Sequence, residues 1–347
     1  MFGFGLEYEG AAFWLPVIWS GIIGIAIIMY VLADGFDLGI GILFNAAQSQ
    51  NWRDRMMFSV APIWDGNETW LILGGAGLFA VFYIAYSILM PALYIPILLM
   101  LIALIFRGVA FEFRFKAESS QRVWDYAFHY GSLFATFAQG LVLGAFIQGF
   151  RVEGRQFAGG TWDWLSPFSI LTGIGLVFGY GLLGATWCVM KTTGDLEAWA
   201  RRMARLFLLG TVASMGVVSL SVIFLGRGIQ DRWFAFPNIV FLAPVPLVTA
   251  FVAYRIWRSL EGGHHYAPFL LTIGLFLLGF LGLAISLFPF IVPPSTTIWQ
   301  ASNTPDSQMF VLVGYAVAMP ITFLYTAYAY WVFRGKVAEE ITGGGYH

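Results

Sequence analysis

The residues best suited to chemistry lie in one short run of the chain, from Trp64 to Trp70, with the sequence WDGNETW. This run places two carboxylic acids, Asp65 and Glu68, and one amide, Asn67, in a segment that must otherwise cross or line a lipid bilayer. A charge at the bilayer centre costs about 2.5 to 3.5 kcal/mol on insertion scales, so a membrane protein rarely keeps one there without a use. The run is therefore a candidate functional site.

More ionisable residues stand at the ends of neighbouring apolar runs: Asp34, Asp37, Arg107, Glu112 and Arg114. Helix positions three apart share a face, so Asp34 projects together with Asp37. Asp65 projects together with Glu68 for the same reason. Four acids that face one region repel each other unless cations or protons intervene.

Arg107 and Arg114 are the expected counter-charges for these acids. A carboxylate in a low-dielectric, like-charged setting can hold and pass a proton, so the group predicts a path for protons or cations from the cytoplasm. The alternative is a buried ion-pair network that fixes the packing of three helices, and the two interpretations are compatible. Trp64 and Trp70 suit interfacial anchors, although either could also flank a quinone ring or an apolar gas path.

The composition indicates which elements position these residues. The chain has 347 residues, of which 59% are hydrophobic and 11% charged, and its mean hydropathy is +0.77. Such a chain is a polytopic membrane protein. About 20 apolar residues are needed to cross the hydrocarbon. We expect an all-α membrane helical bundle of about nine transmembrane helices, arranged as two four-helix bundles plus one peripheral helix, in a single integral membrane domain over residues 1–347. The spans lie near 12–33, 59–82, 84–106, 127–147, 167–190, 205–225, 238–257, 268–291 and 309–333.

The run 59–82 contains the acids and is the least apolar of the nine, so charge counting decides whether it crosses. If it spans, fourteen basic residues lie on one side and four on the other; if it does not, Arg53 and Arg55 change sides and the counts become twelve and six. The positive-inside rule favours nine crossings, with the N-terminus periplasmic and the C-terminus cytoplasmic. Glu7 and Glu9 without a basic residue predict that the first span is retained rather than cleaved.

The sequence lacks the residues needed for several kinds of site, among them haem sites, metal sites and disulfides. A haem in a helical bundle needs inward-facing axial ligands, and the four histidines lie at span ends, in a loop or at the terminus: His129, His264, His265 and His347. We expect His129 to be hydrogen-bonded or interfacial, and this chain to bind neither haem nor metal. Cys188 has no disulfide partner and suits a small buried residue. The net charge of −1 gives no support for a nucleic acid partner.

Glycines recur inside the apolar runs at spacings typical of close helix packing. Gly35 with Gly39 and Gly140 with Gly144 are GxxxG pairs. The segment 179–184 matches GxGxxG literally, but it lies in the middle of a span and has no preceding strand. We interpret it as a small-residue packing face.

Three motifs in order carry a resemblance to a known family: GFDLGIG at 35–41, APIWDGNETWL at 61–71 and FRGVAFEFR at 106–114. Over essentially its whole length the chain resembles subunit II of the cytochrome bd-type quinol oxidases, including their cyanide-insensitive relatives. The resemblance implies a complex in the bacterial cytoplasmic (inner) membrane that oxidises quinol, reduces dioxygen to water and takes up protons from the cytoplasm. It also implies that the haems, b and d or b only, lie in a partner subunit I. The resemblance does not decide whether a structural quinone or a small accessory subunit is present.

By match to the family motifs, Asp65 falls on a proton path toward the haems of subunit I. Asp37 and Arg107 fall on positions that line the same polar region. We expect Asp34 and Glu68 to take part in that path, and we expect support from the surrounding polar cluster: Trp64, Asn67, Trp70, Arg107, Glu112 and Arg114. The alternative function is a cation- or proton-coupled secondary transporter, which intramembrane acids and glycine-rich spans would also suit.

Overall fold

The computed structural model describes residues 7–117, 119–224 and 229–339, and these residues form an almost entirely helical protein. Arg227 and His347 lie outside the described residues. Among those described, the helices of eighteen or more residues are α1 (Gly10–Phe44), α3 (Trp64–Val81), α4 (Tyr83–Phe113), α5 (Gln121–Gln148), α6 (Pro167–Lys191), α7 (Gly194–Phe224), α10 (Pro244–Glu261), α11 (Ala267–Leu287) and α13 (Pro305–Val332). The expected all-α bundle is confirmed.

Short elements join the long helices. They are the helices α2 (Gln50–Phe58), α8 (Ile229–Phe234), α9 (Asn238–Leu242) and α12 (Ile298–Ala301), and two antiparallel hairpins, β1 (Val152–Glu153) with β2 (Gln156–Phe157) and β3 (Phe290–Val292) with β4 (Thr296–Thr297). Local capping sets several of the helix starts. The Ser49 hydroxyl accepts from the Trp52 amide at α2, and Ser166 and Ser169 form a capping box at α6.

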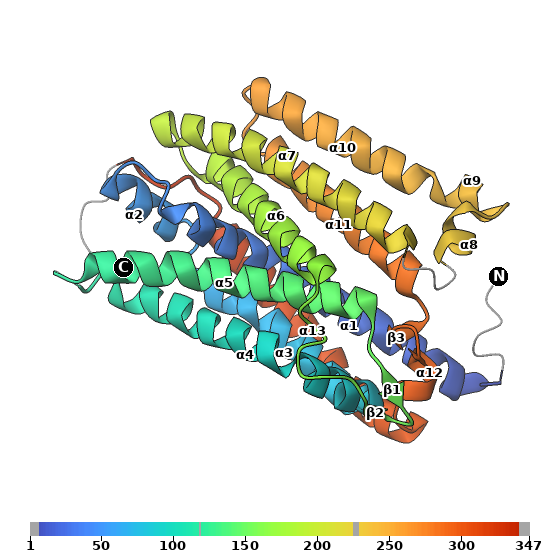
Figure 1. Cartoon of the computed structure of the whole chain (residues 1–347). Helices are drawn as coiled ribbons and strands as arrows, with labels where there is room; N and C mark the ends of the chain where they lie inside the picture. Colours follow the sequence, from blue (N-terminus) through green and yellow to red (C-terminus); the bar gives the residue numbers. More distant parts are fainter. Residues whose placement is uncertain (1–6, 118, 225–228, 340–347) are drawn as a thin grey trace.

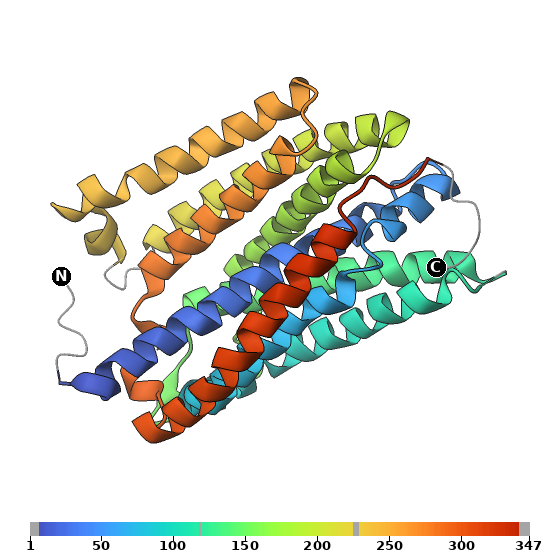
Figure 2. The same ribbon diagram turned by 180° about the vertical axis from the view of Figure 1, so that it is seen from behind.

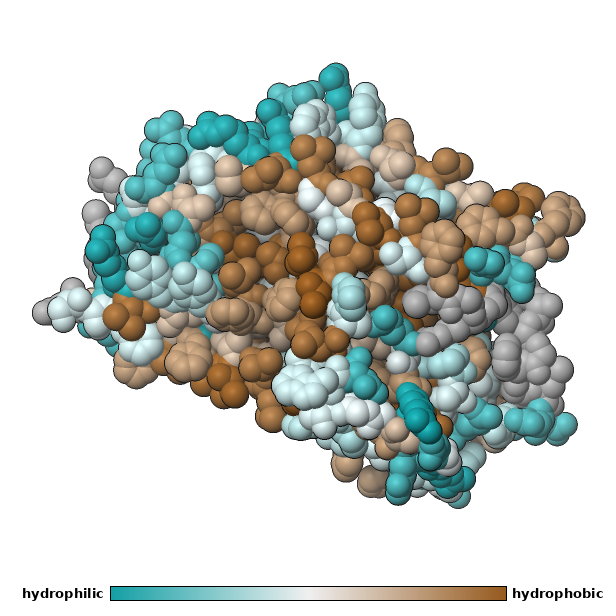
Figure 3. Space-filling view, in the orientation of Figure 1, coloured by the Kyte–Doolittle hydropathy of each residue, from teal (hydrophilic) through white to brown (hydrophobic). Residues whose placement is uncertain are grey.

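The long helices lie side by side, and the chain passes back and forth along one axis (Figure 1). The helices α1, α3, α4 and α5 form one group, and α6, α7, α10 and α11 form a second beside it. Helix α13 lies on the outer side of α1 and α3 (Figure 2). Hydrophobic residues form a broad band across the middle of the molecule, and hydrophilic residues gather at the end that contains α2 and around β1 and β2 (Figure 3).

Within the part of the chain that the structure describes, eight helical stretches are long and apolar enough to cross a membrane, with α9 and α10 counted as one stretch. This indicates a multi-pass membrane protein. Helix α3 is not among the eight, because Asp65 and Glu68 lower its hydropathy. It nevertheless runs beside α1 from the level of Asp37 to the level of Asn303, whose backbone amide donates to the Val81 carbonyl. A ninth crossing by α3, and the orientation of the termini, stay predictions.

Two acids lie deeper in the fold than the sequence suggested. We expected Asp34 and Asp37 to close the first span, but α1 continues to Phe44. At about 1.5 Å per residue the two acids therefore lie roughly 10 to 15 Å before the end of that helix. The expectation was wrong because hydropathy falls where charged residues begin, whereas the helix is held by packing and backbone hydrogen bonds beyond that point.

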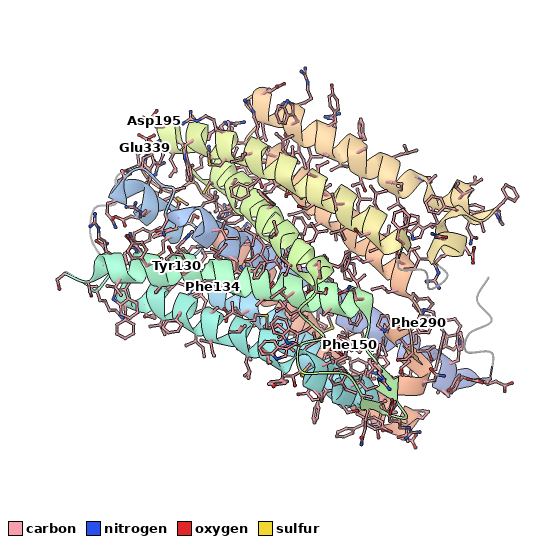
Figure 4. The ribbon with its side chains drawn as sticks, viewed as in Figure 1. Tyr130, Phe134, Phe150, Asp195, Phe290 and Glu339 are labelled. Carbon is pink, nitrogen blue, oxygen red and sulfur yellow. The ribbon has the colours of Figure 1, made fainter. Side chains whose placement is uncertain are left out.

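The C-terminal segment after α13 ties the ends of several helices together. The Val337 amide donates to the Lys191 carbonyl, and Lys336 donates to the Thr192 carbonyl at 2.8 Å. Glu339 lies near the start of α7, close to Asp195 (Figure 4), and accepts from the Thr193 hydroxyl at 2.8 Å. The segment therefore joins α13 to the α6–α7 connection.

Glycines allow α1 and α6 to cross in backbone contact. A Cβ atom on Gly39 would overlap the Tyr180 carbonyl oxygen, and one on Gly184 would overlap the backbone of Gly39. Gly140 and Gly144 approach α6 in the same way, at Gly173 and Ser169. The predicted small-residue packing is confirmed at these positions.

We expect Gly39→Ala to separate α1 from α6 and to lower the free energy of unfolding of the purified protein by about 1 to 3 kcal/mol. The added Cβ would overlap backbone atoms, so no side chain can move away to make room. Gly216→Ala in α7 is the control, since no atom lies within 4 Å of the added Cβ. Thermal unfolding in detergent measures both. Equal behaviour of the two variants would contradict the backbone contact.

Candidate functional site

A fully buried arginine lies at the centre of the first helix group. Arg107 of α4 forms salt bridges through Nη2 with Asp34 of α1 and with Glu68 of α3, the second at 2.9 Å. Arg107 and Asp34 are buried completely, whereas the Glu68 side chain is 27% exposed. The indole of Trp64 lies 5.5 Å from the Arg107 guanidinium and stacks on Phe111 at 4.8 Å. The arginine is thus held by two acids and one aromatic face.

The second acid of α1 belongs to the same polar region. Asn67 donates from Nδ2 to Asp37 Oδ2 at 2.7 Å and to the Ala33 carbonyl at 3.3 Å. The Tyr330 hydroxyl of α13 donates to Asn67 Oδ1 at 2.9 Å, which fixes the orientation of the amide. Asn67 therefore links α1, α3 and α13.

A chain of uncharged groups leads from Asp34 toward α6. The Tyr30 hydroxyl lies beside the Asp34 carboxylate. Gln139 of α5 donates to the Tyr30 oxygen at 2.7 Å, and the Tyr180 hydroxyl donates to Gln139 Oε1 at 2.9 Å. Sequence analysis missed these groups because Tyr and Gln inside apolar runs give no local signal. The available clue was the position of Tyr30 four residues before Asp34, and it concerned that residue alone. We call the assembled groups the polar cluster: Tyr30, Asp34, Asp37, Asn67, Glu68, Arg107, Gln139, Tyr180 and Tyr330.

The polar cluster contains three carboxyl groups and one permanent positive charge. Several of its buried atoms have no hydrogen-bond partner among the residues that the structure describes: Oδ2 of Asp34, Oδ1 of Asp37, and Nε and Nη1 of Arg107. Such groups are normally satisfied, often by ordered water. The excess of acids means that the cluster can take up, hold and release protons.

Asp65 is not part of the buried polar cluster. Its side chain is exposed on α3, although it lies close enough to Glu68 for electrostatic repulsion. Glu68 is therefore the acid that joins the exposed surface to the buried arginine. The two acids share a face, as their spacing predicts, but only Glu68 reaches Arg107.

Arg114 does not serve the acids of the polar cluster, and that expectation was wrong. Its partners are Asp54, at 2.7 Å, and Asp125, at 2.5 Å. Arg107 and Arg114 lie seven residues apart, about 10 Å along the helix. Each guanidinium therefore contacts different residues of the neighbouring helices. Glu112 also lies apart: it pairs with Lys116 at 3.4 Å, and these side chains are 65% and 74% exposed.

The two tryptophans of the central run have different environments. Trp70 is fully buried and packs on Phe323 of α13 at 4.6 Å, beside Tyr30 and Met319. Its interpretation as an interfacial anchor was wrong, because α13 covers it. Trp64 is partly buried against Arg107 and Phe111.

The remaining candidate ligands are not grouped. Across residues 7–117, 119–224 and 229–339, no three His, Cys, Asp or Glu side chains are placed to hold a metal ion. Cys188 is free and buried, as expected. His129 is hydrogen-bonded through Nδ1 to the Gly41 carbonyl at 2.9 Å, which confirms that prediction.

Comparisons with known proteins give one consistent result. The family model for cytochrome bd terminal oxidase subunit II matches residues 15–333. The chain is 28% identical to cytochrome bd-I ubiquinol oxidase subunit 2 of Escherichia coli over 382 aligned positions, which cover 96% of this chain and 97% of that protein. It is 27% identical to cytochrome bd ubiquinol oxidase subunit 2 of Bacillus subtilis, with 93% and 97% covered.

A solved structure has the same fold. The structure of bd oxidase from Geobacillus thermodenitrificans contains a chain that superposes with a TM-score of 0.75 at 17% identity, covering 92% of this chain and 99% of that one. At this identity the likeness concerns the fold alone.

We expect Arg107→Leu to destabilise the protein by about 3 to 5 kcal/mol, because it leaves Asp34 buried without its counter-charge. Adding Asp34→Leu should recover part of the loss, since the uncompensated charge is then removed. Lys116→Ala is the control and should change stability by less than about 1 kcal/mol, because its ion pair is exposed. Thermal unfolding compares the three variants, and a double variant no better than Arg107→Leu alone would contradict the pairing.

Proposed function

The chain belongs to the cytochrome bd terminal oxidase subunit II family, and we propose that its part in that oxidoreductase complex is to conduct protons from the cytoplasm, without a haem of its own, and to stabilise the complex. The protons would be delivered to the oxygen-reducing haems of subunit I. The observation that carries the proposal is the polar cluster, in which Arg107 pairs with Asp34 and Glu68 while a third acid, Asp37, is held by Asn67.

The proposed path begins at the exposed acid of α3. Asp65 attracts protons at the surface, and the partly exposed Glu68 passes them to the buried side of the helix. Asp34 and Asp37 hold the next positions, because each has a buried carboxylate oxygen with no protein partner. Arg107 keeps this negative group stable without binding a proton itself, since a guanidinium stays charged.

The exposed face of α3 suggests where subunit I docks. Asp65, Ile72 and Phe79 follow at intervals of seven residues, so they share one helix face. Ile72 is 70% exposed and Phe79 61% exposed. An acid on such a face is costly against lipid, but not against a protein that offers polar groups. We therefore propose that subunit I docks on the apolar part of this face, at Ile72 and Phe79, and leaves Asp65 at its edge open to protons from the cytoplasm.

We place the haems, b and d or b only, in subunit I. A haem needs axial ligands at membrane depth, whereas His129 is engaged with Gly41, and His264 and His265 lie between α10 and α11. Quinol and dioxygen are then substrates of the whole complex, and the chain is one integral domain of the bacterial inner membrane with nine crossings. The secondary transporter alternative is not favoured, because the relatives found are oxidase subunits.

We expect Asp34→Asn to slow quinol oxidase turnover by about 10²-fold or more in the assembled two-subunit complex, because it removes a buried proton-holding group. Glu68→Gln, which also removes a proton-holding group, should slow turnover in the same direction. Oxygen consumption with excess quinol measures turnover, and haem absorbance measures assembly. Glu112→Gln is the matched control, an acid on α4 outside the polar cluster. Unchanged turnover in both acid variants would contradict the proton path, and loss of haem would favour a purely structural role.

We expect the chain, expressed and purified without subunit I, to show no haem absorption bands. The same preparation from cells that make both subunits should carry haem. Bands that stay with the isolated chain would contradict its haem-free role.

A further inference from the structure

Two polar stripes face each other along the contact between α1 and α5. On α1 the stripe is Tyr30, Asp34, Asp37 and Gly41, and on α5 it is His129, Ser132, Thr136 and Gln139. Successive members of each stripe are three or four residues apart, so each stripe occupies one helix face. Tyr130 and Phe134 mark the opposite, exposed face of α5 (Figure 4).

Hydrogen bonds join the two stripes at both ends. At one end His129 Nδ1 lies 2.9 Å from the Gly41 carbonyl oxygen, and at the other Gln139 Nε2 donates to the Tyr30 hydroxyl at 2.7 Å. The earlier residue of α5 bonds to the later residue of α1, and the reverse holds at the other end, so the two helices run antiparallel. Tyr30 and Gly41 lie eleven positions apart on α1, about 16 Å along the helix. We call the α1–α5 contact between these two hydrogen bonds the α1–α5 seam.

Four buried polar atoms inside the seam have no hydrogen-bond partner among the described residues. Ser132 and Thr136 are completely buried, and neither hydroxyl has a hydrogen-bond partner. On the α1 side, Asp34 Oδ2 and Asp37 Oδ1 are also buried without a hydrogen-bond partner. Ser132 lies directly against α1, because a Cβ on Gly41 would overlap its hydroxyl.

These two hydroxyls differ from most buried hydroxyls on the helices. A Ser or Thr inside a helix usually donates to the carbonyl three or four residues earlier. Thr186, Thr211 and Thr272 do so in this structure, at 2.7 to 2.9 Å. Ser132 and Thr136 instead leave their hydroxyls free within the seam. An unsatisfied buried hydroxyl costs about 1 to 3 kcal/mol, so two on one face indicate that another donor or acceptor binds there.

Water is the molecule whose chemistry fits, since it donates to carboxylates and both donates to and accepts from hydroxyls. We propose that the α1–α5 seam is a second proton inlet, in which His129 takes protons from the cytoplasm and water held by Ser132 and Thr136 passes them to Asp37 and Asp34. This inference rests on the proposed proton conduction and adds a route that bypasses Asp65 and Glu68.

The bonding of His129 suits this position. Its Nδ1 faces a carbonyl oxygen and therefore carries the hydrogen, which leaves Nε2 of the neutral ring as a proton acceptor. A proton bound at Nε2 is released to a water, and each later transfer moves one proton between oxygens until a carboxylate oxygen accepts it. The ring is half-buried at the end of α1, so it is placed between the surface and the seam.

The test uses the complete two-subunit complex in vesicles and compares three variants: Ser132→Ala with Thr136→Val, Glu68→Gln, and all three changes together. If two inlets work in parallel, protons can still enter through one when the other is blocked. The seam substitutions alone, and Glu68→Gln alone, should therefore each lower quinol-driven oxygen consumption only partially. The combined variant should lose about tenfold more than the product of the separate losses. Thr186→Val is the control, because it removes a buried helix hydroxyl that bonds within its own helix, and it should leave turnover unchanged.

The outcomes separate this inference from the proposed function. A combined variant no slower than Glu68→Gln alone overturns the second inlet and leaves proton conduction standing. Unchanged turnover in every variant, Glu68→Gln included, overturns both. Haem absorbance checks assembly of each variant. If the variant with both Ser132→Ala and Thr136→Val loses haem, the two substitutions are measured separately. Thr136→Ser keeps a hydroxyl and should restore turnover if water is held there.

Discussion

The buried guanidinium of Arg107 is the constraint on which the rest of the structure depends. Its charge cannot be removed by deprotonation, and leaving a buried charge unpaired costs several kcal/mol. Asp34 of α1 and Glu68 of α3 must therefore meet α4 at one level. This requirement fixes the register of three helices. It also concentrates more acidic groups than one arginine can neutralise, and the proposed proton conduction rests on that excess. The packing interpretation and the proton interpretation describe one set of contacts.

Helix α1 is the element that makes this arrangement possible. Gly39 lets it cross α6 in backbone contact, and Gly41 lets α5 approach closely enough for Ser132 to touch it. The acids Asp34 and Asp37 lie between these glycines and Tyr30, on the face toward α5. Small residues and acids thus alternate along one helix. Close packing excludes lipid from the acids, and the acids find partners on the helices that packing brings near.

The proposed subunit arrangement rests on the uneven distribution of polar groups. The first helix group contains the polar cluster, whereas the second group, α6 with α7, α10 and α11, contributes chiefly Tyr180 to it. The exposed side of the first group, along α3, presents an acid above apolar side chains. A protein of the cytochrome bd terminal oxidase subunit II family acts in a complex, and the proposed docking uses the exposed apolar side chains of this face.

The sequence by itself determined the class of the protein. Long apolar runs predicted a helical membrane bundle, GxxxG spacings predicted close helix contacts, and three motifs in order indicated the family. It also identified Asp34, Asp37, Glu68, Asn67 and Arg107 as a group, because charged residues inside apolar runs are conspicuous. Only the tertiary structure decided which of them meet. It separated Arg114 and Glu112 from the cluster, placed Asp65 on the surface, and added Tyr30, Gln139, Tyr180 and Tyr330. The physical reason is that helical spacing defines a face within one helix, while the partner opposite that face comes from distant segments whose register is set by packing.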